Sequence, residues 1–327
     1  MPEFRTIVEP DAHSVKLGYH THALFAGSCF TQSVGGYLEE LKFPVRINPF
    51  GTLYNPVSVA RLLERLLEGN PFRKEELTHA GDTWFSFLHS TAFSGTDAGA
   101  VLKRINQNFT ESISFIQNLK FLFLTFGTSR VYEWNEDGRI VANCHKLPAK
   151  QFRHRLLDVD EIVARYSILL ENWYARYPDL QVVFTVSPVR HWKDGPYGNQ
   201  VSKSVLFVAI EALLDLFHNA IYFPAYELMM DDLRDYRFYA EDMLHPGRVA
   251  IEYIREKFRK TFVDPEALPV MQSLEKVRKA MLHKPLDRDS REYKTFAARQ
   301  LQIVQGLQEK YNFLDLSGEI KFWNRNR

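Results

Sequence analysis

Five short apolar segments, each bounded by turn-forming residues, constrain the fold of this chain more than any other feature. They lie at residues 22–27, 43–51, 120–127, 181–188 and 220–229. Apolar runs of this length are typical of strands that are covered on both faces of a parallel sheet.

Segments with helical periodicity separate these runs. In residues 56–67, for example, Val59, Leu62 and Leu66 recur at spacings of three and four and share one face. Alternating strands and helices predict right-handed βαβ units, hence an α/β fold with a parallel sheet between two helical layers. Ligand sites in such folds lie beyond the carboxyl ends of the strands. The other periodic segments are residues 31–41, 158–176 and 202–217.

The composition changes near residue 263. Residues 271–311 are rich in Lys, Arg, Glu, Gln and Leu and contain no strand-like run. We therefore expect an α/β domain over residues 1–262 and a helical C-terminal appendage, residues 263–327, packed on it. Within the appendage, residues 313–323 are expected to form a strand or an irregular tail.

Charge and cysteine content argue against several classes of protein. The formal net charge of +1 offers no electrostatic footprint for nucleic acid. Two cysteines are too few for a disulfide framework or a zinc ribbon. No segment approaches the ~20 apolar residues of a membrane span, and the first thirty residues lack the apolar core of a signal peptide. We expect a cytoplasmic protein without a metal or another cofactor.

The first chemical motif is Gly27-Ser28-Cys29-Phe30-Thr31, between a buried strand and an amphipathic helix. A turn at this place exposes a nucleophile at the carboxyl edge of the sheet. The free N–H groups of the helix start lower a thiol pKa or stabilise an oxyanion. The alternative is structural, with Ser28 capping the helix and Cys29 filling space.

The second motif is the Asp-x-x-His sequence of Asp242 and His245, just before an amphipathic helix. A carboxylate three residues before an imidazole can orient it as a general base toward a nucleophile from elsewhere in the fold. The alternative is that Asp242 caps a turn and His245 is a loop residue.

Together the two motifs, with several further boxes, resemble the GSCFA family, a branch of the SGNH (GDSL-like) hydrolases. The matching boxes are GSCFT at residues 27–31, NPFGTLYNP at 48–56, TFGTS at 125–129, NCHKLP at 143–148 and TVSPVRH at 185–191. The resemblance implies a three-layer αβα, flavodoxin-like fold and a nucleophile served by Asp242 and His245.

The resemblance leaves two candidates for the nucleophile. Superposing the Gly-Asp-Ser-Leu motif of the superfamily on residues 27–30 puts Cys29 in the place of the nucleophilic serine. A shift of one residue would make Ser28 the nucleophile instead. We favour Cys29, because a helix start and a nearby His245 suit a lowered thiol pKa.

The expected oxyanion hole departs from the superfamily pattern. The resemblance points to Gly51 and to the block that begins at Gly127, where Ser129 replaces the usual asparagine. A serine hydroxyl can donate one hydrogen bond in its place. Otherwise the side-chain amide of Asn48, Asn55 or Asn143 must supply the missing oxyanion donor. Losing one oxyanion donor typically costs ~3 kcal/mol in the transition state.

Polar residues near the strand ends are candidates for substrate binding. Arg190 and His191 follow a predicted strand directly, and Asn48, Asn143 and His145 lie in the matching boxes. The favoured function is hydrolysis of an acyl ester on a small molecule or a carbohydrate. The alternatives are an acyltransferase on the same site and, because of Ser129, a non-catalytic binding module with a degenerate oxyanion hole.

Overall fold

A sheet of five parallel strands forms the centre of the protein in this computed structural model, which describes residues 5–326. The spatial order is β10-β9-β5-β1-β2, and every neighbouring pair is parallel. The prediction of an α/β fold with a central parallel sheet is confirmed. The strands are β1 (His22–Gly27), β2 (Val45–Ile47), β5 (Leu119–Phe126), β9 (Gln181–Val186) and β10 (Ala220–Tyr222).

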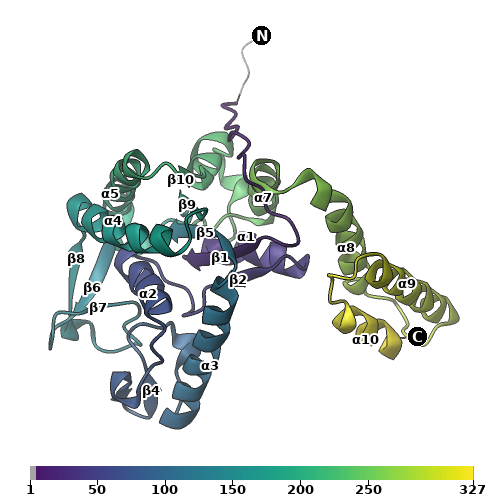
Figure 1. Cartoon of the computed structure of the whole chain (residues 1–327), viewed down its shortest axis with the longest axis horizontal. Helices are drawn as coiled ribbons and strands as arrows, with labels where there is room; N and C mark the ends of the chain where they lie inside the picture. Colours follow the sequence, from purple (N-terminus) through teal and green to yellow (C-terminus); the bar gives the residue numbers. More distant parts are fainter. Residues whose placement is uncertain (1–4, 327) are drawn as a thin grey trace.

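Helices cover both faces of this sheet (Figure 1). One layer consists of α1 (Cys29–Glu40) and α7 (Arg248–Phe262), and the other of α2 (Pro56–Glu68), α3 (Ala98–Ile116), α4 (Val159–Arg176) and α5 (Gly195–Leu216). Side chains alternate along each strand, so that Phe25 and Phe123 pack with α1 and α7 while Leu24 and Leu122 pack with the helices of the other face.

Two of the expected strands are much shorter than predicted. The segment 43–51 contributes only β2, because Asn48 adopts a left-handed conformation (φ 44°) and turns the chain. The segment 220–229 leaves the sheet after β10 at Phe223-Pro224 and continues as α6 (Ala225–Glu227) and a π-helix (Leu228–Asp232). Apolar character alone cannot separate a strand from a buried helix here.

Two small antiparallel sheets extend the layer of α2 and α3, and neither was anticipated. One is the hairpin of β3 (Thr78–Ala80) and β4 (Thr83–Phe85). The other has the order β7-β6-β8, formed by β6 (Arg130–Trp134), β7 (Ile140–Val141) and β8 (Phe152–Leu156). Short 3-10 turns occur at Lys74–Glu76, Thr91–Phe93, Ala149–Gln151, Trp192–Asp194, Tyr236–Phe238 and Pro265–Ala267.

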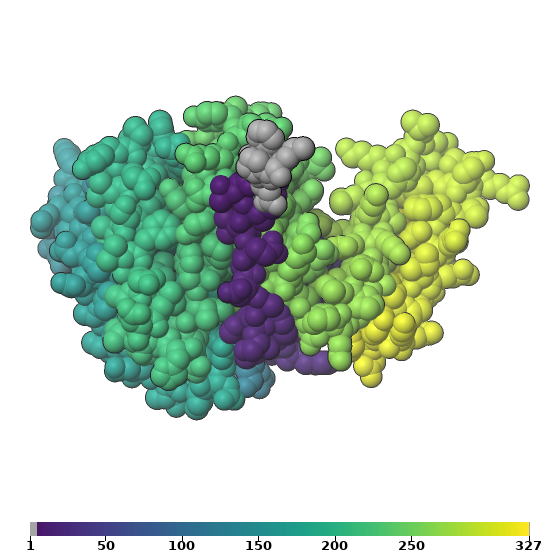
Figure 2. All heavy atoms as spheres, turned by 90° about the horizontal axis from the view of Figure 1, so that it is seen from above, coloured from purple at the N-terminus to yellow at the C-terminus, as the bar shows by residue number. Residues whose placement is uncertain are grey.

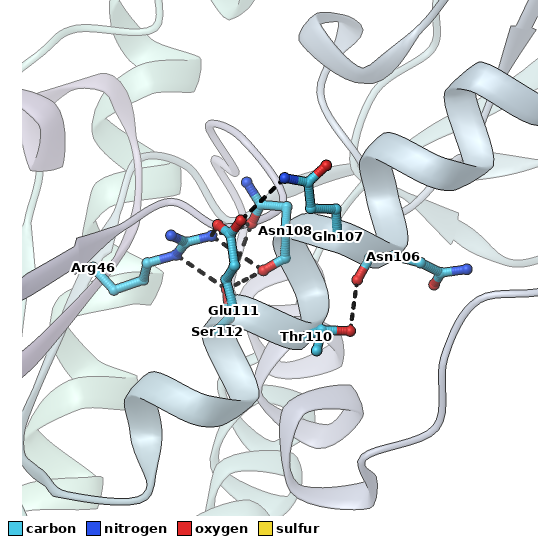
Figure 3. Close-up of polar contacts among 7 residues, drawn as sticks. All are labelled: Arg46, Asn106, Gln107, Asn108, Thr110, Glu111 and Ser112. Carbon is cyan, nitrogen blue, oxygen red and sulfur yellow. Dashed lines mark hydrogen bonds and ion pairs between the residues drawn. The ribbon is translucent and has the colours of Figure 1, made fainter.

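Polar contacts fasten the edge strand β2 to α3 (Figure 3). The guanidinium of Arg46 donates to Ser112 Oγ at 3.1 Å, Asn108 Oδ1 at 2.9 Å and Glu111 Oε2 at 3.2 Å. A three-residue edge strand has few ladder hydrogen bonds, so these contacts help to hold it in place.

The C-terminal segment forms a helical unit of α8 (Leu268–Met281), α9 (Arg291–Lys310) and α10 (Ser317–Asn326). The expectation of a strand or irregular tail at 313–323 was wrong, because a helix starts at Ser317 and fully buries Trp323. The unit stands beside the main body with an indentation between them (Figure 2). Its apolar residues join the core formed by α1 and α7, and Lys42 pairs with Glu319 at 2.8 Å.

Within residues 5–326, no helix combines the length and the apolar character that crossing a membrane requires.

Candidate functional site

The turn between β1 and α1 is shaped by Gly27. Its φ of 139° is a conformation that favours glycine, and a methyl group there would lie 2.1 Å from Thr125 O. The Ser28 N–H donates to the same carbonyl at 3.0 Å. The turn is therefore closed tightly against the end of β5, and α1 begins at the next residue, Cys29.

The two candidate nucleophiles differ in exposure. Ser28 is only 1% exposed, and its buried Oγ has no hydrogen-bond partner among the described residues. Cys29 is half-buried. Of the two side chains, only that of Cys29 is open to a substrate without a rearrangement of the turn.

The expectation of a lowered thiol pKa was wrong. Burial raises the pKa of the Cys29 thiol and outweighs the groups that lower it, which are the N–H groups of Cys29 and Phe30 and the ammonium of Lys203. The helix start acts in the predicted direction, but desolvation of the thiolate is the larger effect.

Asp242 and His245 form the hydrogen bond that their spacing predicted. Asp242 Oδ2 lies 2.6 Å from His245 Nδ1, and Asp242 Oδ1 accepts from the N–H groups of Leu244 and His245 at 3.0 and 2.9 Å. These contacts lower the pKa of Asp242 to about 2. The carboxylate is thus ionised at neutral pH and fixes the imidazole with Nε2 as its free nitrogen. Both side chains are about half exposed.

The expected oxyanion donors are engaged elsewhere. The Gly51 N–H donates to Asn48 O at 2.7 Å, and the Gly127 N–H donates to Tyr54 O at 2.8 Å. Ser129 is fully buried and its hydroxyl donates to Ser202 O at 2.9 Å, on the side of α5. None of the three has a donor left for a substrate oxygen in this structure.

Asn48 places an unused donor close to the turn. Its Oδ1 accepts from the Gly27 N–H at 2.9 Å, while its buried Nδ2 has no partner within residues 5–326. Asn55 has a structural role instead, because its side chain caps α2 by accepting from the Ser58 N–H at 2.8 Å. Asn48 Nδ2 is therefore an unpaired amide donor at the carboxyl end of β1.

His191 lies against the turn, as its position after β9 predicted. A methyl group at Gly127 would lie 3.1 Å from His191 Nε2, 3.2 Å from Tyr54 O and 3.4 Å from Ser28 Cβ. Burial, followed by the positive charge of Lys203, lowers the pKa of His191 to about 4, and His245 acts in the same direction. His191 is thus a neutral imidazole packed against the β1–α1 turn.

Arg190 and His145, the next two predicted binding residues, make separate contacts. The Arg190 guanidinium lies over the Trp192 ring at 4.7 Å, and the Arg190 N–H approaches Leu244 O at 3.5 Å. His145 stacks on Phe85, with ring centroids 4.2 Å apart, and its Nε2 lies 3.0 Å from Ser86 O. His145 thus stabilises the β4 region and does not line the pocket described next.

A pocket of about 260 Å³ opens beside His191, between the β6–β8 sheet and the loop after β9. Tyr54 and Asn143 share its wall with the cationic groups Arg130 and Lys193. Asp194 neutralises part of this charge, at 3.8 Å from Arg130 Nε. His191 itself lines the pocket, whose wall combines charged and amide groups with apolar surface.

Lys203 is the site residue to which the sequence motifs assigned no role. It is fully buried, and its Nζ donates to Gly127 O at 2.7 Å and to Ser187 O at 2.6 Å. Burial lowers its pKa to about 7. The available signal was its position in α5, where it shares the buried stripe of Asn199 and Leu206.

The fold and site define an α/β protein with a parallel five-stranded sheet and a hydrogen-bonded Asp–His pair just before α7. The model of the GSCFA family matches residues 22–258, and the model of the GSCFA domain protein C-terminal domain matches residues 274–326. The chain belongs to the GSCFA family. No curated protein matches it.

Proposed function

We propose that this protein is an acyl-ester hydrolase of the SGNH type, with Cys29 as nucleophile and Asp242 and His245 as the base pair. The observation that carries the proposal is the Asp242–His245 hydrogen bond of 2.6 Å beside a sheet edge that also presents a half-buried Cys29. The strand order β2-β1-β5-β9-β10 supports it, since it is the flavodoxin-like doubly wound order.

The chemistry follows from these groups. Cys29 Sγ attacks the acyl carbon, its proton passes to His245 Nε2, and the alcohol leaves with that proton. Water then hydrolyses the thioester, with His245 again accepting a proton. The oxyanion is stabilised by the Cys29 N–H and by Asn48 Nδ2, the donors that remain near the turn.

The pocket beside His191 is the proposed place for the remainder of the substrate. Arg130, Lys193 and Asn143 offer hydrogen-bond donors, and Tyr54 offers an aromatic wall. This lining suits a hydroxyl-rich or anionic small molecule, including a carbohydrate, better than a lipid. We keep the cytoplasm as the proposed compartment.

A short-chain aryl ester, 4-nitrophenyl acetate, tests the proposal. The wild-type protein should release 4-nitrophenol catalytically, Cys29→Ala should be inactive, and Ser28→Ala should retain most of the activity. Mass spectrometry of a quenched reaction should find the acetyl group on the peptide that contains Cys29. Full activity of Cys29→Ala would contradict the proposal.

A binding module is the second candidate, and one observation favours it. The N–H groups of Gly51 and Gly127 and the hydroxyl of Ser129 are all engaged within the protein. An enzyme site with so few free oxyanion donors stabilises a tetrahedral intermediate weakly. If no acyl substrate is turned over, while carbohydrates or organic acids bind near His191, this function replaces the first.

A further inference from the structure

Arg130, at the start of β6, is a cation in the wall of the pocket beside His191 whose charge the protein compensates only in part. Its side chain is 26% exposed, and its ion pair with Asp194 is long, 3.8 Å from Nε to Oδ1. The buried Nε has no hydrogen-bond partner within residues 5–326. A partly buried charge without close partners costs free energy, which an anion entering the pocket would offset.

Asp194 cannot compensate this charge fully, because two side chains share it. The same Oδ1 atom lies 3.6 Å from His154 Nε2, so both of its contacts are longer than a hydrogen bond. Gly198 in α5 packs beside the pair, where a methyl group would lie 3.0 Å from Asp194 Cβ and 3.6 Å from Arg130 Nη2. The start of α5 thus supports the carboxylate and the guanidinium at this separation.

Lys193 adds a second positive charge to the same wall. Its Nζ donates to the Tyr132 hydroxyl at 2.6 Å and lies 4.8 Å from the centre of that ring. The hydroxyl of a tyrosine is uncharged at neutral pH, so this contact orients the ammonium without cancelling its charge.

The two cations and the one carboxylate leave the wall with an excess of one positive charge at neutral pH. Burial keeps the two histidines of the wall neutral, because it lowers the pKa of His154 and lowers that of His191 to about 4. Burial also raises the pKa of the Cys144 thiol in the wall to about 11, so that this group is uncharged as well. The pocket therefore suits an anion with a single charge.

The pocket lies next to the turn that precedes Cys29. Tyr54 and His191 line it, and both also approach Gly127. A methyl group at Gly127 would lie 3.2 Å from Tyr54 O, 3.1 Å from His191 Nε2 and 3.4 Å from Ser28 Cβ. The wall of the pocket thus reaches the residue before the proposed nucleophile.

We propose that this pocket binds a carboxylate of the substrate through Arg130 and Lys193, so that the substrate is a small ester that also carries a carboxylate. A planar carboxylate can accept two parallel hydrogen bonds from a guanidinium, and its single charge matches the excess charge of the wall. The inference rests on the proposed hydrolase function and narrows its substrate. A neutral carbohydrate would leave the charge of the wall uncompensated.

Calorimetric titration of the Cys29→Ala variant with benzoate tests the site without turnover. Benzoate carries a planar carboxylate, and benzamide is a neutral molecule of nearly the same shape. Benzoate should bind about tenfold or more tightly than benzamide, the scale of a hydrogen bond between charged groups. Equal affinities for the two compounds, or no binding of benzoate, would overturn the inference.

Substitutions in the wall should change the affinity for benzoate in opposite directions. Arg130→Gln should weaken binding about tenfold, because the guanidinium is lost. Asp194→Asn should strengthen binding, because a competing carboxylate is removed. A merely structural role of these residues would not give opposite signs. Arg153→Gln is the control and should leave the affinity unchanged, since Arg153 lies in β8, pairs with Glu133 and does not line the pocket.

A second variant keeps the test decisive if Arg130→Gln does not fold. Lys193 is exposed, so Lys193→Gln should fold and should also weaken the binding of benzoate. If benzoate binds to the folded variants of both cations as tightly as to the parent protein, this pocket is not the carboxylate site.

Competition connects the pocket to the proposed reaction. In the wild-type protein, benzoate should inhibit the hydrolysis of 4-nitrophenyl acetate competitively, so that KM rises and kcat does not change. Binding without inhibition would overturn the inference and leave the hydrolase in place. If the protein hydrolyses no ester but binds benzoate in a manner that depends on Arg130, the hydrolase fails and the carboxylate site stands.

Discussion

At the scale of single residues, Asp242 and His245 are the most self-contained part of the site. All three contacts of the Asp242 carboxylate are made within four consecutive residues, and Met243 between them takes a left-handed conformation (φ 58°). Both side chains project into solvent from a loop, so their geometry depends little on the core. Their removal should therefore affect chemistry much more than folding.

We expect His245→Ala to lower kcat/KM on an active ester by about a hundredfold or more, the usual scale for losing a general base. The temperature of thermal unfolding should change little, because the side chain is half exposed. Steady-state kinetics and calorimetry check the two statements. His218→Ala, at an exposed histidine between α5 and β10 on the opposite edge of the sheet, is the control. Equal kinetics for both variants would remove His245 from the mechanism.

At the scale of elements, the β1–α1 turn determines whether Cys29 reaches the sheet edge. The turn holds because Gly27 lies against Thr125 and because Asn48, after β2, accepts from the Gly27 N–H. Three segments far apart in the sequence thus fix one turn. The position of the nucleophile is a property of this packing as well as of the local motif.

Gly27→Ala should lower the free energy of unfolding by more than about 2 kcal/mol, since the added methyl group would collide with Thr125 O in a backbone conformation unfavourable for alanine. Gly306→Ala provides the contrast, because that glycine lies inside α9 with open space around it. It should be neutral or stabilising by up to ~1 kcal/mol. Urea denaturation measures both, and similar values would contradict the clash.

At the scale of the whole molecule, buried neutral histidines should make the fold sensitive to acid. Burial lowers the pKa of His89 to about 3 and that of His191 to about 4, against about 6.5 in the unfolded chain. Below pH 6.5 the unfolded state therefore binds more protons than the folded state. The contribution of these two histidines to the free energy of unfolding is fully present above this pH and decreases as the pH falls toward 4.

Each of these histidines should cost about 2 kcal/mol of stability between pH 7 and pH 5, from about 1.4 kcal/mol per pKa unit. Urea denaturation at the two pH values measures the loss. His89 stacks on Phe50, with ring centroids 4.4 Å apart, so His89→Phe fits the same aromatic cluster without a titrating group. Between pH 7 and pH 5, the free energy of unfolding of this variant should fall by about 2 kcal/mol less than that of the wild type. An equal fall in both proteins would show that the titration of His89 does not contribute.

The sequence by itself determined those features that depend on local spacing. Apolar runs and helical periodicity predicted the alternation that produces a parallel sheet, and the Asp-x-x-His spacing predicted the hydrogen bond between Asp242 and His245. Local patterns also placed Cys29 at a helix start. These features involve residues close in the chain, whose geometry follows from backbone conformation.

Only the tertiary structure decided which of the site's polar groups are free and how they ionise. Gly51, Gly127 and Ser129 match their family boxes, but the donors on which the predicted oxyanion hole depended are engaged within the protein, and the partners of Gly127 and Ser129 lie far away in the sequence. The rise in the Cys29 pKa and the fall in the Lys203 pKa likewise come from desolvation by packed elements. Desolvation and hydrogen-bond competition are sums over long-range contacts, which no short segment encodes.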